Sequence, residues 1–252
     1  MSSDMLPRWR SVLAVVAHPD DESFALGAVL SLFADSGTVV WVLCLTRGEA
    51  STLHGVLGDL GVLRQKELSD AADALGVTRV VLRSFPDGAL EGVPSEELEA
   101  EVRQAAVHSH ADGVVAFDLA GVTGHRDHTV ATQAALAAAG ALGLPVLGWT
   151  LPTAVADVLN AEFGASFSGH DAADLDVFVK VDRSRQRRAV ACHASQAVPG
   201  SVLWRRLELL ADTEHLRWLT ASPSPATEVL HHLAGATAPA PTTLDRTSAW
   251  TP

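Results

Sequence analysis

The chain has 252 residues, of which 48% are hydrophobic and 19% are charged, and its formal net charge is −12 at pH 7. This length and composition are typical of a globular protein with a full core, and we predict one domain over residues 1–233. The acidic balance argues against nucleic acid or an anionic membrane surface as a partner, because both need a basic face, and it favours a neutral or cationic small molecule.

Cysteine use and the two ends of the chain indicate where the protein acts. The two cysteines do not make a disulfide framework, and Cys44 lies in an apolar run, which favours a reducing, cytoplasmic environment. Residues 1–10 lack the apolar core of a signal peptide, and no run is long enough for a membrane span. Ala, Pro and Thr dominate residues 234–252, which predicts a disordered tail. The sequence leaves the oligomeric state open, a homo-oligomer included.

The first predicted strand ends in a group of polar side chains. Residues 12–17 form an unbroken apolar run rich in Val, as expected for a strand that a parallel sheet buries on both faces. His18, Asp20 and Asp21 follow this strand, with a proline that stops it. Adjacent side chains point in different directions, so we expect one aspartate to bind a metal ion and the other to face the substrate. In the alternative interpretation, both acids only cap the next helix.

Strands and helices alternate along the rest of the chain. Further strands are predicted at residues 38–45, 80–82, 114–117, 146–151, 177–181 and 215–220. Helices are predicted at 24–33, 62–76, 94–110, 129–139, 155–163, 184–193 and 202–210. This alternation implies right-handed crossovers and an α/β fold with a mostly parallel sheet. The glycine-rich residues 53–61 are expected to form a mobile connection.

A second polar cluster follows the strand predicted at residues 114–117. His125, Asp127 and His128 open the next helix. Because the carboxyl ends of parallel strands share one edge of a sheet, we expect His128 to meet His18 and Asp21 there. Two histidines and one carboxylate with open coordination positions suit catalytic Zn²⁺, and the same set also suits Fe²⁺.

The neighbouring side chains have expected roles around such an ion, which would lower the pKa of its water to about 7 and polarise a carbonyl oxygen. Asp20 is placed to take the water's proton, a contribution of roughly 10²- to 10⁴-fold. A cationic His125 would stabilise the tetrahedral oxyanion or deliver a proton to the departing amine, and both roles stay open. Asp127 is expected to orient one of the histidines.

Two other positions have simple structural interpretations. Arg64 and Glu67 lie one turn apart on a predicted helix, and an exposed ion pair within that helix is the simplest interpretation. His193 ends another predicted helix, where it caps the helix or overhangs the site.

Several short motifs occur in one order over residues 12–196. They are A-H-P-D-D-E at 17–22, T-R-G-E-A-S at 46–51, R-Q-K-E-L at 64–68, L-G-V at 75–77, P-D-G at 86–88, H-R-D-H at 125–128 and H-A-S-Q at 193–196. In this combination the chain resembles the PIG-L or LmbE-like zinc N-deacetylases, which include the GlcNAc-phosphatidylinositol, mycothiol and bacillithiol-pathway deacetylases. The chain departs from the family pattern at Arg126, where the family has Pro, and at Ser51, where it has Gly.

The resemblance implies a three-layer sandwich with a twisted, Rossmann-like sheet, and a zinc enzyme. It implies His18, Asp21 and His128 as zinc ligands, Asp20 as general base, and His125 as the charge-stabilising or acid partner. It also raises Arg64 to a substrate or oxyanion contact and Glu49 to a further contact. Mycothiol deacetylase-like members carry a tyrosine where this chain has Thr123, so the substrate of those members is not carried over.

We therefore expect hydrolysis of an N-acetyl group on a GlcNAc-type small molecule, which releases acetate and a free amine. One alternative keeps the chemistry and changes the substrate to a thiol conjugate or an antibiotic sugar. A metal-dependent phosphoesterase is an alternative of another class, although such sites usually hold two metal ions and more carboxylates. A non-catalytic sugar-binding relative is a third. Specificity is expected to lie in residues 53–61, 89–94 and 119–123 and in the region after residue 152.

Overall fold

The structure, a computed structural model, describes residues 4–51 and 59–220. Its strands are β1 (Ser11–Val16), β2 (Val39–Thr46), β3 (Arg79–Phe85), β4 (Gly113–Phe117), β5 (Val146–Thr150), β6 (Val177–Lys180) and β7 (Thr213–Trp218). Its α-helices are α1 (Asp21–Phe24), α2 (Gly27–Asp35), α3 (Leu60–Leu75), α4 (Ser95–His108), α5 (Arg126–Leu142), α6 (Thr153–Phe163), α7 (Ser184–Cys192) and α8 (Val202–Leu210). Two short 3₁₀ turns, η1 (Leu90–Gly92) and η2 (Ala172–Asp174), complete the described elements.

All of these strands belong to one seven-stranded sheet with the order β3-β2-β1-β4-β5-β7-β6. Neighbours from β3 to β5 are parallel, and β7 lies antiparallel between β5 and β6. The predicted α/β fold with a mostly parallel, Rossmann-like sheet is confirmed. The order reverses between β1 and β4, and this is the place where open α/β sheets bind ligands.

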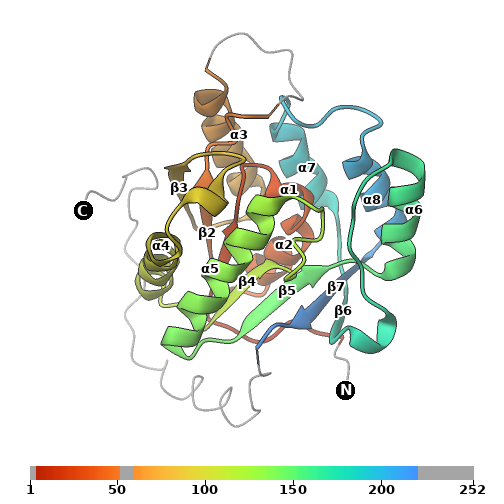
Figure 1. The fold of residues 1–252 in the computed structure, drawn as a ribbon. Coiled ribbons are helices and arrows are strands. Elements are labelled where there is room, and N and C mark those ends of the chain that lie inside the picture. The colour runs from red at the N-terminus through yellow and green to blue at the C-terminus, as the bar shows by residue number, and fades with distance from the viewer. Residues whose placement is uncertain (1–3, 52–58, 221–252) are drawn as a thin grey trace.

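Helices cover both faces of the sheet, as predicted for a three-layer sandwich (Figure 1). Side chains of β1 alternate between the two cores: Val12, Ala14 and Val16 face the core beneath α2, α3 and α7, whereas Leu13 and Val15 face the core beneath α4 and α5. Because both faces of β1 are buried, its sequence reads as a continuous apolar run. The central strand therefore has a fixed register and a fixed carboxyl end.

The prediction of one helix after β1 is wrong in detail, because α1 ends at Phe24 and α2 begins at Gly27. Side chains from other helices bond the last carbonyls of α1: Gln186 Nε2 donates to Ser23 O and Phe24 O at 3.0 and 3.2 Å, and Arg206 donates to Phe24 O at 2.5 Å. A Cβ at Gly27 would lie 2.9 Å from Gln186, so the chain passes close to α7 here. These long-range contacts let a very short helix end, and local sequence did not reveal them.

Two predictions fall wholly or largely outside the described residues. The tail at 234–252 lies outside them, as do residues 53–58 of the expected connection. The division into a domain over residues 1–233 and a tail therefore stays a prediction. Within the described ranges no helix is both long and apolar enough to cross a membrane, and Cys44 and Cys192 are free.

Candidate active site

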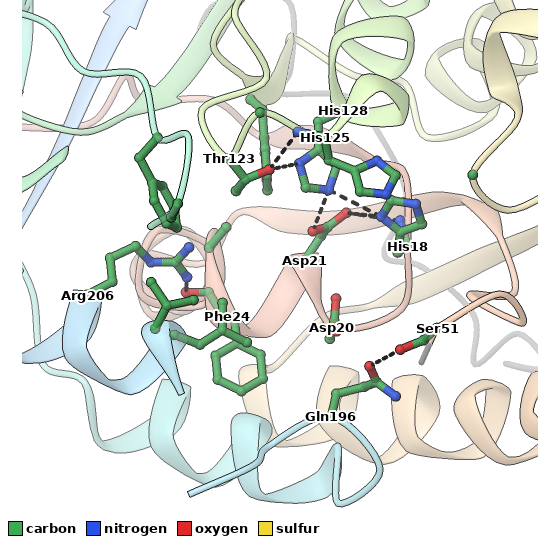
Figure 2. Close-up of a pocket in the computed structure, with 18 of the residues that line it drawn as sticks. His18, Asp20, Asp21, Phe24, Ser51, Thr123, His125, His128, Gln196 and Arg206 are labelled. Carbon is green, nitrogen blue, oxygen red and sulfur yellow. Dashed lines mark hydrogen bonds and ion pairs between the residues drawn. The ribbon is translucent and has the colours of Figure 1, made fainter. Parts of the chain in front are cut away.

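The site lies at the carboxyl edge of the sheet, where β1 and β4 end. His18 follows β1, Asp21 opens α1, and His128 lies in the first turn of α5. His18 Nδ1 lies 3.2 Å from His128 Nε2 and 3.5 Å from Asp21 Oδ2, and His128 Nε2 lies 3.1 Å from Asp21 Oδ1. Figure 2 shows these three side chains converging, with Asp20 beside them. Segments about 110 residues apart are thus brought within contact distance.

The outer nitrogen of each histidine is bonded away from this convergence point. His18 Nε2 lies 3.1 Å from Asp87 Oδ1 and 3.3 Å from Asp127 Oδ2. His128 Nδ1 lies 2.7 Å from Thr123 Oγ1 and 3.3 Å from Gly121 O. Each outer nitrogen can therefore carry the proton, which leaves a lone pair on the inner nitrogen, as in metal-binding histidines. Two imidazole lone pairs and a carboxylate fit a divalent cation such as zinc or ferrous iron.

The electrostatics of the cluster favour positive charge next to its carboxylates. Burial opposes protonation of His18, but the carboxylates of Asp127, Asp21 and Asp87 outweigh it and raise the His18 pKa well above its usual value. Burial also acts to raise the pKa of Asp21, yet His128 and His18 bring it well below the usual range. The carboxylates around His18 and His128 thus stabilise positive charge in this cluster.

Two other groupings, each of which includes His18, are also close enough to hold an ion. Ring nitrogens of His18, His125 and His128 lie within 4.8 Å of one another, as do ligand atoms of His18, Asp87 and Asp127. The grouping with Asp87 and Asp127 uses the outer nitrogen of His18. The set of His18, Asp21 and His128 uses its inner nitrogen. The two positions therefore lie on opposite sides of the His18 ring, and an ion's location distinguishes them.

Asp20 is held beside this cluster in an unusual backbone conformation. Its φ is 111° and its ψ is −26°, a left-handed conformation that costs a residue other than glycine on the order of 1–3 kcal/mol. Its Oδ2 lies 3.0 Å from Arg64 NH2, and no described residue donates to its Oδ1. Burial raises the pKa of Asp20 to about 6, although Arg64 acts in the opposite direction. The carboxylate is therefore a base near neutral pH.

Arg64 reaches this aspartate from a buried position on α3. Its guanidinium donates to Gly48 O at 2.8 Å, to Pro19 O and to Asp20 Oδ2. Gly48 has φ 65°, and a Cβ there would overlap the guanidinium, so glycine is required for this approach. The prediction of an exposed pair with Glu67 is wrong: both residues are buried, and Glu67 accepts from Ser195 N and Oγ at 2.8 and 2.6 Å.

His125 caps α5 and also lines the cavity. Its Nδ1 accepts a hydrogen bond from Asp127 N at 3.2 Å, and its ring centroid lies 4.6 Å from that of His18. Burial and the positive charges of His18 and His128 lower its pKa. The expectation of a cationic His125 is thus disfavoured in this environment, and the neutral imidazole carries its proton on Nε2.

Asp127 and Asp87 form the wall behind His18. Asp127 accepts from Gly88 N at 2.8 Å and from Leu90 N at 3.1 Å, so it ties the turn after β3 to α5. The role of Asp87 was not predicted, although it stands in the P-D-G motif, which was the available signal. Glu49 is exposed, and its Oε1 accepts from Asp87 N at 3.1 Å. Through this hydrogen bond, Glu49 supports the turn after β3.

His193 does not overhang the cavity. It is fully buried at the end of α7, and its Nε2 lies 2.6 Å from Glu22 Oε1. The H-A-S-Q motif marked His193 as a residue of interest. It did not reveal the partner, Glu22 of the A-H-P-D-D-E motif, which is 171 residues away.

A cavity of about 700 Å³ opens onto the cluster. Its lining includes the polar residues described above. It also includes the apolar residues Phe24, Ala25, Phe117, Ala165, Phe167, Val202 and Leu203. Of the segments expected to set specificity, Thr123 and the region after residue 152 contribute to the lining, whereas residues 89–94 do not.

The fold and the site define an α/β protein with a candidate His/Asp metal centre at the switch point of its sheet. Residues 13–139, about half of the chain, match the family model described as PIG-L, GlcNAc-PI de-N-acetylase. The chain is 32% identical over 271 aligned positions to the 1D-myo-inositol 2-acetamido-2-deoxy-alpha-D-glucopyranoside deacetylase of Nakamurella multipartita, with 85% of this chain and 90% of that protein covered. The chain belongs to the PIG-L family, as its motifs predicted.

Other proteins are similar to this chain at lower identity. A probable N-acetyl-alpha-D-glucosaminyl L-malate deacetylase 2 of Bacillus anthracis is 25% identical, with 85% of this chain and 93% of that protein covered. The N,N'-diacetylchitobiose deacetylase of Pyrococcus horikoshii superposes with a TM-score of 0.63 at 20% identity, over 91% of this chain and 88% of that chain. The 4-carboxy-2-hydroxymuconate hydratase of Pseudomonas putida superposes with a TM-score of 0.61 at 18% identity, over 85% and 98%. Because the same fold carries a hydratase, the fold alone does not fix the reaction.

Proposed function

We propose that this chain is a zinc-dependent N-deacetylase that removes the acetyl group from an N-acetylated amino-sugar conjugate. The observation that carries the proposal is the convergence of His18 Nδ1, Asp21 and His128 Nε2 within 3.5 Å, beside a carboxylate with a pKa of about 6. Membership of the PIG-L family and the deacetylases among its similar proteins support the same reaction. The low cysteine count supports action in the cytoplasm.

His18, Asp21 and His128 would hold the ion. When bound, a zinc ion supplies Lewis-acid chemistry, because it makes water more acidic and polarises an amide carbonyl. Fe²⁺ would suit the same donors. Asp87, Asp127 and Thr123 keep the two histidines in the tautomers that this requires, since they bond the outer nitrogens.

Asp20 acts as general base in this proposal. At pH 7 a carboxyl group with a pKa of about 6 is about nine-tenths ionised, so it accepts the proton of the attacking water. Arg64 occupies Oδ2, which leaves Oδ1 for the water. Asp20 then carries the proton that the departing amine needs. Asp20 gives this proton to the amine and is then a carboxylate again.

His125 stabilises the tetrahedral intermediate. Because its Nδ1 accepts from Asp127 N, the neutral ring holds its proton on Nε2 and donates a hydrogen bond from Nε2 to the developing oxyanion. The remaining N–H of a neutral imidazole is too weakly acidic to protonate the departing amine, so we assign the acid role to Asp20.

The apolar residues of the cavity lining suit the carbon faces of a sugar ring and its conjugate. Three phenylalanines, Phe24, Phe117 and Phe167, line it. Thr123 bonds His128 and is shorter than a tyrosine, so a transition-state contact from a tyrosine hydroxyl is absent at this position. An inositol conjugate, a malate conjugate, a thiol conjugate and an antibiotic sugar are therefore separate candidates for the substrate.

The experiment is acetate release from N-acetylglucosamine conjugates by the chain loaded with zinc. Conjugates of inositol and of malate, an N-acetylated thiol conjugate and a glycopeptide sugar make up the substrate panel. We expect acetate and free amine in equal amounts from at least one of them, and none from the Asp20→Asn variant. Phosphate release from a phosphoester panel, with two metal ions per chain and no acetate, would favour the phosphoesterase alternative.

A further inference from the structure

Two side chains outside the cavity, Glu22 and His193, connect to Asp20 through hydrogen bonds, and the proposed chemistry does not use them. Glu22 and His193 are both fully buried, with no exposed side-chain surface. Glu22 Oε2 accepts a hydrogen bond from the backbone N–H of Asp20 at 2.9 Å. Its other oxygen, Oε1, lies 2.6 Å from His193 Nε2 and accepts from Ser23 Oγ at 2.5 Å. Neither Glu22 nor His193 lines the cavity.

These bonds act on a residue with an unusual backbone conformation. Asp20 has φ 111°, and such a conformation persists only where the surroundings hold it. The Glu22 carboxylate holds its backbone N–H, and Arg64 holds its side chain at 3.0 Å. The backbone and the carboxylate of Asp20 are therefore fixed by two different partners.

His193 orients the Glu22 carboxylate. Its Nδ1 is buried without a hydrogen-bond partner among the described residues, so its hydrogen is on Nε2, where Glu22 accepts it. With Oε1 taken by His193 and Ser23, Oε2 is left to accept from Asp20 N. The end of α7 thereby reaches the turn after β1.

We propose that Glu22 and His193 are positioning residues that hold Asp20 in its catalytic conformation. This inference rests on the proposed function of Asp20 as the general base. The competing explanation is that the two residues only fasten α7 to α1 and contribute to stability. A positioning role lowers kcat when the contact is lost, because a displaced base reacts poorly in a bound complex whose substrate contacts are intact.

The test compares His193→Leu with His193→Gln. Leucine removes the donor to Glu22, whereas the amide nitrogen of glutamine replaces it. We expect His193→Leu to lower kcat about 100-fold, with KM and bound zinc within about twofold of the wild type. We expect His193→Gln to recover kcat to within about tenfold of the wild type. If His193→Leu does not fold, Glu22→Gln takes its place, because its amide puts a second donor against Asp20 N or His193 Nε2.

The matched control for Glu22→Gln is Glu214→Gln, which makes the same substitution at another fully buried carboxylate. Glu214 accepts from Trp149 Nε1 at 2.8 Å and bonds Arg183, and it has no contact with Asp20. We expect it to lower the melting temperature and leave kcat within about twofold, since it touches none of the reacting groups. An equal loss of kcat in this control, or full kcat in folded His193→Leu or Glu22→Gln, would overturn the proposal.

Crystal structures of the wild type and His193→Leu give a readout that does not need turnover. We expect Asp20 N to lose its bond to Glu22 in the variant and Asp20 to leave its left-handed conformation. If Asp20 keeps both its bond to Glu22 and its left-handed conformation in the variant, the positioning role is wrong. If the wild type releases no acetate from any conjugate, the proposed function fails, and these structures still decide whether Glu22 and His193 hold Asp20.

Discussion

Replacing Asp20 by Asn removes a base and keeps the shape of the side chain. The asparagine carbonyl can still accept from Arg64, which lies 3.0 Å from Asp20 Oδ2. The variant cannot take a proton from water at neutral pH, so we expect kcat to fall roughly 10²- to 10⁴-fold, the usual contribution of a positioned base. The zinc content should stay the same, because the proposed ligands are His18, Asp21 and His128.

The same change is expected to stabilise the metal-free protein. Because burial raises the pKa of Asp20 to about 6, the folded state binds its proton more tightly than the unfolded state does. The ionised group therefore lowers stability increasingly as the pH rises from about 4 to about 6, and by about 3 kcal/mol at neutral pH. Asparagine carries no charge and avoids this cost, so its free energy of unfolding at pH 7.5 should be higher than that of the wild type.

Two measurements check this prediction. Acetate release gives kcat, and urea unfolding with a chelator present, followed by tryptophan fluorescence, gives the free energy of unfolding. A kcat within about tenfold of the wild type would refute Asp20 as the base. Lower stability of Asp20→Asn at pH 7.5 would refute the argument that ionised Asp20 is held at an energetic cost.

Three other predictions follow from contacts in the structure. Thr123→Val removes the nearer of the two partners of His128 Nδ1 and should weaken zinc binding about 10- to 100-fold, as measured by competition with a chelating dye, whereas Thr123→Ser should keep it. Arg64→Lys should lower kcat about 10- to 100-fold in the acetate assay, because one ammonium group cannot replace bonds to Asp20 and two carbonyls; a kcat equal to wild type would contradict this. Burial and the Arg183 charge lower the pKa of His215 to about 4, so stability is lost as the pH falls from about 6.5 towards 4, where the unfolded state binds the proton first. Between pH 7.5 and pH 5, the melting temperature of His215→Gln should fall less than that of the wild type. An equal fall in both proteins would contradict this role of His215.

Features encoded by short segments were predictable from the sequence. Residues 12–17 are apolar at every position because both faces of β1 are buried, so the end of this run at His18 could be located. The parallel alternation then placed His128 at the same edge, and the structure brings its Nε2 within 3.2 Å of His18 Nδ1. Which of these residues bind an ion stays a prediction.

Features that depend on partners distant in sequence were not predictable. Arg64 looked like half of an exposed helical pair, because its true partner, Asp20, is 44 residues away. The break between α1 and α2 depends on Gln186, which is more than 160 residues from the carbonyls it bonds. Glu22 likewise gave no local sign of its bond to His193. Long-range polar contacts of this kind have no periodicity that a sequence pattern could reveal.

The location of a bound ion tests the central claim most directly. A crystal structure of the zinc-loaded chain, with anomalous data collected at the zinc edge, should show one ion bound by His18 Nδ1, an Asp21 oxygen and His128 Nε2. The side chain of Asp20 should lie beside the ion's open coordination positions without binding it. An ion on the other side of the His18 ring, held by Asp87 and Asp127, or a pair of ions in the site, would contradict the account.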